Sequence, residues 1–277
     1  MPAIIISGCT GIGKTKLALE LTKEFPIRII SADSVQVYSG LDIGSNKERD
    51  NHMLIDLVPF NQKFTHEDYR LSAENAIRQS IEDGYTPLIV GGTGMYLEML
   101  NVPIKFFLVC DRRILFRKTD LRCEIMVENG LLEEIAVLQK NGFDEYCIGS
   151  RGIGYRDGMI FINKLKSTKS YSQEMYNDFL HFLKCFQRRT RNYIRKQETF
   201  FRNKKYIWIN CDKFDAKSII KEVINGKLKG LEEIHNESCN VNNKCFNKMK
   251  TYQTELKIYN SEIKIKKVIN NLIKLLK

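Results

Sequence analysis

The eight residues from Gly8 to Thr15 constrain this chain more than any other part of its sequence. They match the pattern G-x-x-x-x-G-K-[ST] in full, between a short β-branched run and a segment with apolar residues at helical spacing. In such a loop, glycines let main-chain N–H groups curl around phosphate oxygens, and the following helix adds the positive end of its dipole. The lysine supplies a point charge and the threonine hydroxyl a ligand for Mg²⁺. The sequence therefore predicts a phosphate site made of Gly8, Cys9, Thr10, Gly11, Ile12, Gly13, Lys14 and Thr15.

Strands and helices alternate through the first 110 residues. Apolar runs predict strands at 3–7, 28–31, 86–90 and 106–110, and helical spacing predicts helices at 14–25 and 66–83. This alternation is typical of a parallel sheet, which binds ligands at the carboxyl ends of its strands. We therefore expect an α/β fold of the P-loop NTPase type, in which helices flank a doubly wound parallel sheet and the C-terminal part is helical and basic.

After residue 110 the pattern becomes mainly helical. It predicts helices at 113–129, 131–140 and 172–202 and a last strand at 206–209. The apolar residues of 258–277 share one helical face, which favours packing on the protein body or a partner over a membrane surface or RNA. The polar stretch 229–256 is interpreted as a linker. The expected parts are a core at 1–110, a helical part at 111–210 that returns to the core, and an extension at 211–277.

The chain is basic, and much of the charge lies near its end. Its 277 residues include 44 Lys and Arg against 33 Asp and Glu, a formal net charge of +11, and residues 203–277 alone hold 16 Lys against 8 Asp and Glu. This excess favours a polyanionic partner such as nucleic acid, but many soluble proteins are basic, so charge alone does not select one. No apolar run reaches the roughly 20 residues that span a bilayer, and the first strand leaves no room for a signal peptide. A cytoplasmic protein without membrane contact is expected.

The eight cysteines show no C-x-x-C spacing, which disfavours a zinc or redox site. Cys239 and Cys245, with His235 upstream, form one loose cluster, whose spacing and single histidine argue against a zinc finger. We expect reduced thiols in a reducing compartment.

Five blocks follow the phosphate loop in a characteristic order, at 31–45, 52–56, 90–97, 151–156 and 191–202. With them, the chain resembles the tRNA dimethylallyltransferases, or IPP transferase family. The corresponding family patterns are D-S-x-Q-x-Y running into D-I-G-T, H-H-L-I-D, V-G-G-T-G-x-Y, I-G-Y-[RK] and R-x-x-x-[KR]-[KR]-Q. The resemblance covers residues 4 to about 210.

The resemblance implies transfer of a dimethylallyl group from dimethylallyl diphosphate to N6 of adenosine 37 in tRNA, beside the anticodon. An adenine amine is a weak nucleophile that loses a proton as the C–N bond forms, so a carboxylate must lie beside it. Asp33 is the predicted base, with a helix cap or a magnesium-shell role as its alternative. Lys14, the loop amides and Mg²⁺ on Thr15 would neutralise the leaving diphosphate, and Thr93 would orient the amine or the leaving oxygen. Arg191 is the basic residue that the family pattern directs to the diphosphate, with a solvated helix face as its alternative.

The target base must leave the anticodon stack before it can react. Basic and aromatic residues alternate over 184–202, which suits a single-stranded loop, although core packing explains the aromatic side chains equally well. The predicted tRNA contacts are Asp33, Ser34, Val35, Gln36, Arg151, Gly152, Ile153, Gly154, Tyr155, Arg156, Arg195, Lys196, Gln197 and Arg202.

The chain departs from the family pattern in two places. Family members carry a long helical insertion after the G-G-T-G-x-Y helix, with an H-P-N-D block and an R-A-L-E helix that clamp the anticodon stem. Here only residues 101–105 separate Leu100 from the strand at Phe106. The C-terminal zinc finger of eukaryotic members is also missing. The catalytic blocks are therefore kept and the RNA clamp is shortened, which leaves weak activity, lost activity, or rescue by the lysine-rich C-terminal region open.

Three other functions fit parts of the pattern. A small-molecule or nucleoside kinase would use Lys14, Thr15 and Asp33 in phosphoryl transfer. An adenylate prenyltransferase would keep the prenyl chemistry with a free nucleotide as acceptor, and an RNA-binding remnant would have lost turnover. The partners expected for the first interpretation are tRNA and dimethylallyl diphosphate, and the protein is expected to be a monomer.

Overall fold

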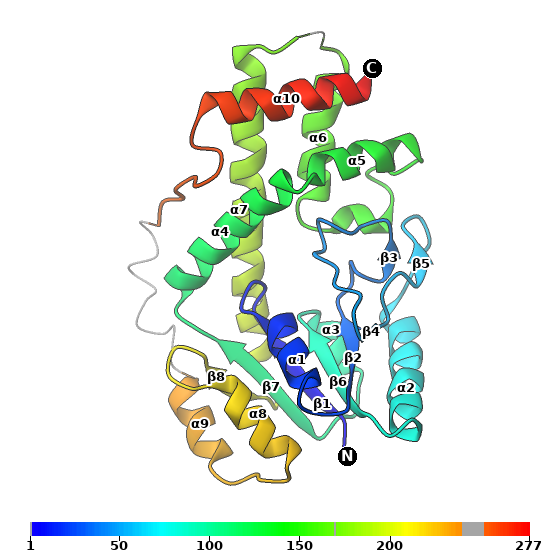
Figure 1. Cartoon of the computed structure of the whole chain (residues 1–277), viewed down its shortest axis with the longest axis vertical. Coiled ribbons are helices and arrows are strands. Elements are labelled where there is room, and N and C mark those ends of the chain that lie inside the picture. Colours follow the sequence, from blue (N-terminus) through cyan, green and yellow to red (C-terminus); the bar gives the residue numbers. More distant parts are fainter. Residues whose placement is uncertain (1, 169, 240–251) are drawn as a thin grey trace.

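The computed structural model describes residues 2–168, 170–239 and 252–277. Its lower part is a parallel sheet of six strands in the order β4-β2-β6-β1-β7-β8 (Figure 1). The strands are β1 (Ile4–Gly8), β2 (Ile27–Ala32), β4 (His52–Met53), β6 (Thr86–Gly91), β7 (Ile104–Val109) and β8 (Ile207–Asn210). A separate pair of short parallel strands is formed by β3 (Tyr38–Ser39) and β5 (Val58–Pro59). The expected P-loop type of α/β fold is confirmed.

Alternate side chains of the strands enter two different cores. Ile4 and Ile6 of β1 pack with α1 (Lys14–Thr22) and α8 (Ala216–Ile224) on one face of the sheet. Ile5 faces the other way, into the core under α2 (His66–Glu82) and α3 (Gly94–Glu98). All of these strand residues are buried, as expected for a parallel sheet covered by helices on both faces.

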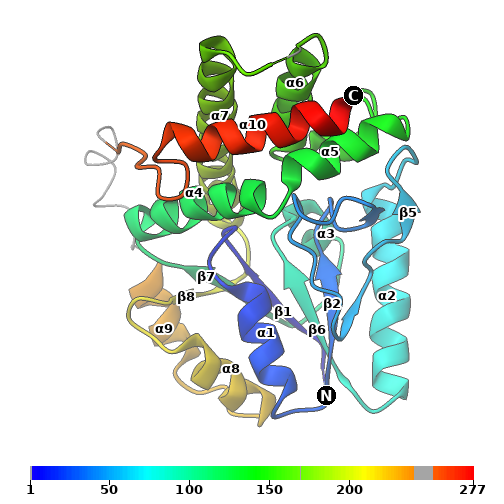
Figure 2. The same ribbon diagram turned by 45° about the horizontal axis from the view of Figure 1, so that its top comes forward.

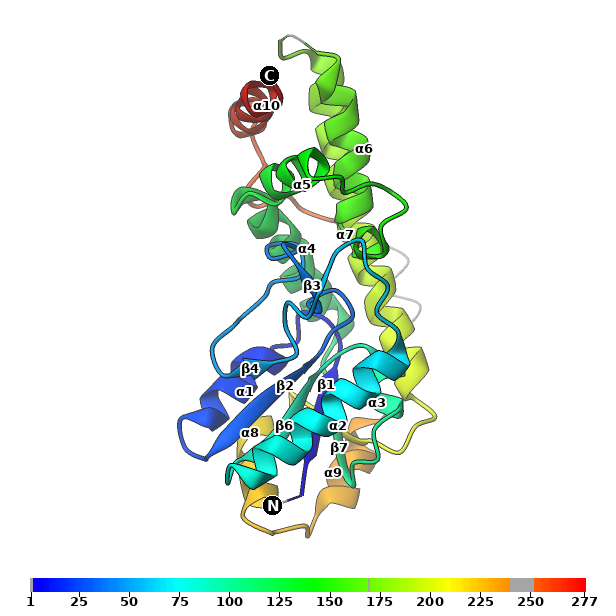
Figure 3. The ribbon, with the colours of Figure 1, turned by 90° about the vertical axis from the view of Figure 1, so that its right-hand side faces the viewer.

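A helical part lies beyond the carboxyl ends of the strands (Figures 2 and 3). It consists of α4 (Arg112–Glu128), α5 (Leu131–Lys140), the short η1 (Ile148–Arg151), α6 (Tyr155–Lys166), α7 (Gln173–Phe201) and α10 (Glu262–Leu276). The long helix α7 runs from this part down to the sheet, where Phe201 packs against Phe107 of β7. Because α7 spans both parts, it fixes the helical part over the strand ends.

The apolar face predicted for the C-terminal segment packs on the body, although the helix begins at Glu262 rather than at residue 258. Ile265, Ile269, Leu272 and Ile273 are buried in the same core as α5, α6 and α7. Among the described residues, no helix is long and apolar enough to cross a membrane.

The linker expected at 229–256 is wrong in its first part, because α9 (Leu231–Ser238) lies there. This helix covers the edge strand β8. The main-chain N–H of Trp208 donates to Nδ1 of His235, and that of Asn210 donates to the hydroxyl of Ser238. An uncovered edge strand would leave such N–H groups unpaired, so side chains that looked like linker residues instead complete the sheet. Residues 240–251 of the same stretch, and Cys245 with them, lie outside the described residues.

Candidate functional site

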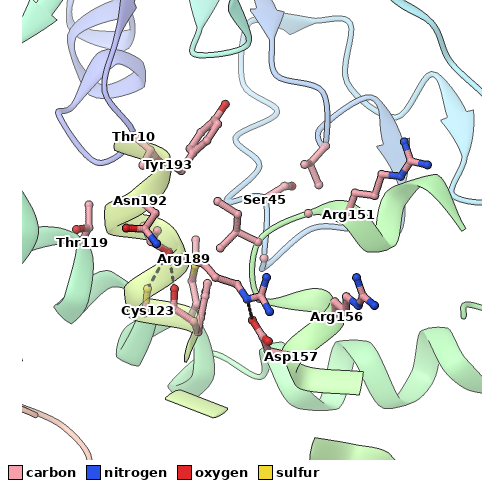
Figure 4. Close-up of a pocket in the computed structure, with 18 of the residues that line it drawn as sticks. Thr10, Ser45, Thr119, Cys123, Arg151, Arg156, Asp157, Arg189, Asn192 and Tyr193 are labelled. Atoms are coloured by element: carbon pink, nitrogen blue, oxygen red, sulfur yellow. Dashed lines mark hydrogen bonds and ion pairs between the residues drawn. The ribbon is translucent and has the colours of Figure 1, made fainter. Parts of the chain in front are cut away.

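A cavity of about 980 Å³ lies between the strand ends and the helical part (Figure 4). Its walls come from the phosphate loop, the turn after β2, α4, the segment from η1 into α6, and α7. Thr10 and Asp33, which follow β1 and β2, line the sheet end. Arg151 and Arg156 lie on the far wall. Segments separated by more than 100 residues in sequence therefore form one site.

The phosphate loop has the backbone that its glycines predict. Gly11 and Gly13 have φ angles of 80° and 107°, which residues with a Cβ rarely adopt. A Cβ atom on Gly11 would also lie 2.5 Å from Cγ2 of Thr119, so the loop can pack against α4 only with glycine there. Lys14 donates from Nζ to the main-chain carbonyls of Gly8 and Cys9, each at 2.9 Å. Burial lowers the pKa of Lys14 to about 8, because removal from water disfavours the charged ammonium group.

Asp33 begins the turn that follows β2. Its Oδ1 atom accepts from the main-chain N–H groups of Val35 at 2.8 Å and Gln36 at 3.4 Å. The hydroxyl of Thr93 accepts from the N–H of Ser34 at 3.0 Å, so the two predicted catalytic residues are held next to each other by this turn. No helix begins at Asp33, so the helix cap considered as an alternative is not found; the Asp33 carboxylate closes a turn instead, and this occupies one carboxylate oxygen. Among the described residues, no hydrogen-bond partner contacts the Oδ2 atom.

Gln197 joins the two glycine-rich loops. Its Oε1 accepts from the N–H of Thr10 at 2.8 Å, and its Nε2 donates to the carbonyl of Gly92 at 3.1 Å. The hydroxyl of Tyr193, one helical turn earlier on α7, donates to the same carbonyl at 3.3 Å. Gln197 is 4% exposed, so the structure places this predicted tRNA contact beneath the loops rather than on the cavity wall.

Arg122 is the main site residue that the sequence analysis missed. It lies on α4, lines the cavity, and its Nη1 is 3.4 Å from the hydroxyl of Thr10 in the phosphate loop. Its charge contributes to the lowered pKa of Lys14, and burial lowers the pKa of Arg122 itself. Within the described part of the chain, no carboxylate lies at ion-pair distance from this guanidinium. Two half-buried cations, Lys14 and Arg122, therefore lie close together beside the phosphate loop, and of the two only Arg122 lines the cavity.

Arg191 occupies a different position from the one that the family pattern suggests. It forms an ion pair with Asp120 at 2.5 Å, donates to the hydroxyl of Thr254 at 2.9 Å, and lies over the ring of Tyr252. It does not line the cavity. Its predicted contact with a diphosphate stays a prediction, and in this structure its guanidinium already has a buried carboxylate as partner.

The far end of the cavity is cationic. Arg151, Arg156 and Arg189 line it. Asn192, Tyr193 and Lys196 of α7 line the cavity closer to the sheet, where Tyr193 contacts the second glycine-rich loop. Arg189 forms an ion pair with Asp157 at 2.8 Å, which Figure 4 shows beside Arg156. Side chains of this kind suit the phosphates and the polar base edges of a nucleic acid.

Most of the remaining predicted tRNA contacts lie in the cavity wall, and four do not. Ser34, Val35, Gly152, Ile153 and Gly154 line it. Gln36 is held by Ser31 and the carbonyl of Ser45, and Tyr155 is buried with its hydroxyl donating to Glu134. Arg195 lies over the ring of Phe116, and Arg202 is an exposed residue at the end of α7. Gln36 and Tyr155 therefore shape the wall from behind.

Comparison with known proteins agrees with this architecture. The family model described as IPP transferase matches residues 36–106 and 101–204, and that of isopentenyl transferase matches residues 1–55. A tRNA dimethylallyltransferase from Alkaliphilus oremlandii is 26% identical, over 82% of this chain and 97% of its own. Another from Lachnoclostridium phytofermentans is 25% identical, over 80% of this chain and 96% of its own.

Two solved structures share the fold, each with a TM-score of 0.69. One is a tRNA isopentenylpyrophosphate transferase from Staphylococcus epidermidis, 23% identical, which covers 82% of this chain and all of its own. The other is a eukaryotic dimethylallyltransferase acting on tRNA, 17% identical, which covers 94% of this chain and 90% of its own.

The same comparisons confirm that an insertion is missing. Because 82% of 277 residues is about 227, about 87 of the 314 positions aligned with the Alkaliphilus protein have no residue in this chain. The two matches to the IPP transferase model meet at residues 101–106, where the sequence shortens the connection to β7. With family models matched from residue 1 to residue 204, this chain belongs to the IPP transferase family.

Proposed function

We propose that this chain transfers a dimethylallyl group from dimethylallyl diphosphate to N6 of adenosine 37 in tRNA. The observation that supports it most is that Thr10 of the phosphate loop, Asp33 and a cationic far wall line one cavity. The relatives named tRNA dimethylallyltransferase support the same donor and acceptor.

The proposed place for the diphosphate is the end of the cavity at Thr10, where Arg122 lies within 3.4 Å of the Thr10 hydroxyl and Lys14 lies close by in the phosphate loop. Fixed donors at this end stabilise the negative charge that develops on the leaving oxygen as the C–O bond breaks. Removal from water disfavours the charged forms of both Lys14 and Arg122. A diphosphate carries enough negative charge to compensate both of them.

Magnesium fits this end as a partner of the diphosphate. Thr15, in the first turn of α1, would supply one hydroxyl ligand. In the part of the chain that the structure describes, no group of three or more His, Cys, Asp or Glu side chains forms a site by itself. Phosphate oxygens and water would therefore complete the coordination, as is usual for Mg²⁺. When bound, the ion adds positive charge at the leaving group.

Asp33 is the proposed base. As N6 of the adenine forms its bond to the prenyl carbon, the bond from that carbon to the diphosphate oxygen breaks, and one N6 proton moves to the carboxylate. The turn that holds Oδ1 leaves Oδ2 available for this proton. Thr93, fixed to Ser34, is the proposed group that orients the amine.

The acceptor enters from the cationic end. A base turned out of the anticodon loop would reach Asp33, while the guanidinium and ammonium groups of Arg151, Arg156 and Lys196 contact the flanking phosphates.

One assay distinguishes this proposal from its alternatives. The protein is incubated with dimethylallyl diphosphate, Mg²⁺ and either unmodified tRNA or AMP, and the products are digested and analysed by mass spectrometry. N6-prenylated adenosine formed only with tRNA is the expected result. Product formed with AMP supports an adenylate prenyltransferase, and ADP formed from ATP with a metabolite acceptor supports a kinase.

A further inference from the structure

The last described segment of the chain, residues 252–277, crosses the outside of the helical part; we call it the C-terminal strap. We propose that the strap positions α4, and that Asp120 and Glu124 are positioning residues through which it places Arg122 at the diphosphate end of the cavity. The inference rests on the proposed function, because it assigns Arg122 to the diphosphate.

Glu124 is the first anchor of the strap. Its carboxylate accepts from three successive main-chain N–H groups, those of Lys257 at 3.0 Å, Ile258 at 2.7 Å and Tyr259 at 3.0 Å. The side chain is fully buried. A buried carboxylate is stable only with such partners, so the strap backbone and this helix residue require each other.

Asp120, one turn earlier on α4, is the second anchor. It is 2% exposed, and its Oδ2 accepts from the hydroxyls of Tyr252 at 2.9 Å and Thr254 at 3.0 Å. Its Oδ1 pairs with Arg191 of α7. Asp120 therefore connects α4 both to the strap and to α7.

The anchors and the cavity residues lie on different faces of α4. Asp120 and Glu124 are four residues apart and share one face, whereas Thr119, Arg122 and Cys123 line the cavity. A helix transmits a shift of one face to the other because its backbone is rigid over these two turns. A movement of α4 on the strap side would therefore displace Arg122 relative to Thr10.

The rest of the strap fixes these anchors to the protein. Tyr259 packs edge-on against Phe179 of α7, and the buried face of α10 lies across α5, α6 and α7 (Figures 1 and 2). Lys140 of α5 donates to the carbonyl of Leu275, and Tyr171 donates to Glu262. The strap is thus held at both ends of its path over the helical part.

The test uses the full chain and inorganic pyrophosphate with Mg²⁺, with binding measured by calorimetry. Glu124→Gln keeps the side-chain size but removes the carboxylate that accepts three N–H groups. Pyrophosphate affinity should fall about fivefold, within the range seen for coupling through packed networks. Glu128→Gln, an exposed change one turn later on α4, is the matched control and should leave the affinity unchanged.

A double-mutant cycle separates positioning from general destabilisation. If the strap acts through Arg122, Glu124→Gln should cause no further loss of affinity in the Arg122→Gln background. The KM for dimethylallyl diphosphate should rise in Glu124→Gln, while the KM for tRNA stays the same. The double variant Tyr252→Phe with Thr254→Val, which removes only two hydroxyls at Asp120, should give a smaller loss of about twofold with the same dependence on Arg122.

The inference would be overturned if Glu124→Gln and the Tyr252→Phe, Thr254→Val double variant both kept the wild-type pyrophosphate affinity. It would also be overturned if Glu124→Gln lowered the affinity as much in the Arg122→Gln background as in the wild type. Either result would leave the proposed function standing. A wild-type protein that binds no pyrophosphate would overturn both.

Discussion

The main-chain N–H of Thr10 donates to Oε1 of Gln197 at 2.8 Å, so a residue 187 positions later in the chain fixes the phosphate loop. The same amide side chain donates to Gly92, in the second glycine-rich loop. A Cβ atom on Gly92 would lie 2.3 Å from Nε2 of Gln197, so a larger residue there would displace this amide. One buried amide group thereby sets the spacing between the phosphate loop and the loop that carries Thr93.

Replacing Gln197 with methionine should loosen both loops. The change nearly keeps the volume, but it leaves the Thr10 N–H and one bond of the Gly92 carbonyl without their partner. We expect the free energy of unfolding to fall by about 1–3 kcal/mol, together with weaker pyrophosphate binding. Urea denaturation and calorimetry measure the two effects. Thr199→Ala, an exposed change on α7, is the control, and equal stability of the Gln197 and Thr199 variants would contradict the bracing role.

The two candidate guanidinium groups for the diphosphate should respond differently to substitution. Arg122→Gln removes a cation that faces the loop, so pyrophosphate affinity should fall about tenfold or more. Arg191→Gln breaks a buried ion pair with Asp120, so it should cost about 3 kcal/mol of stability, while affinity falls only about twofold, as expected for a disturbed Asp120 anchor. Arg117→Gln, an exposed change on α4, controls for loss of charge. The opposite pattern, with affinity lost only in the Arg191 variant, would support the family-based assignment instead.

The sequence was informative where the structure depends on neighbouring residues. The strand, glycine loop and helix at 4–22 are contiguous, and their spacing alone predicted the phosphate site and the direction of the sheet. Asp33 and Thr93 were predicted in one site because both follow parallel strands, whose carboxyl ends meet at one edge of the sheet. The hydrogen bond between Thr93 and Ser34 shows that they are held together there.

Contacts between distant segments were not predictable. Arg122 reaches Thr10 across 112 positions, and nothing in the sequence of α4 distinguishes it from Arg117, which is exposed. The sequence predicted a linker and a helix over the strap, and not its contact with α4. A sequence pattern does not reveal that Glu124 accepts hydrogen bonds from N–H groups 133 to 135 positions away. Helix α9 was missed because its apolar face is short and its polar residues His235 and Ser238 bond to the edge of the sheet.

Lys14 should make the stability of the protein depend on pH. Its pKa is lowered by burial from 10.5 to about 8 in the folded protein, so between these values the unfolded chain binds the extra proton. Stability should therefore rise with pH across this window, by at most about 3 kcal/mol, relative to Lys14→Met. Urea denaturation of both proteins across that window measures the difference. Saturating pyrophosphate should flatten the rise, because an anion favours the charged ammonium. If the difference in free energy of unfolding between the two proteins stayed constant with pH, burial would not lower the pKa of Lys14.

Asp33→Asn should separate binding from chemistry. The amide oxygen at Oδ1 can still accept from Val35, so the turn and the neighbouring Thr93 should keep their positions. The amide cannot take the N6 proton, and loss of a positioned base typically costs about 10² to 10⁴ in rate. We therefore expect tRNA and pyrophosphate affinities within about twofold of wild type, with single-turnover formation of prenylated adenosine at least a hundredfold slower. Ser34→Ala, which keeps the main-chain bond to Thr93, controls for disturbance of the turn. An Asp33→Asn rate equal to that of wild type would remove this carboxylate from the chemistry and direct attention to Thr93 and bound water, whereas a loss of tRNA binding would show that Asp33 acts on the acceptor before the bond forms.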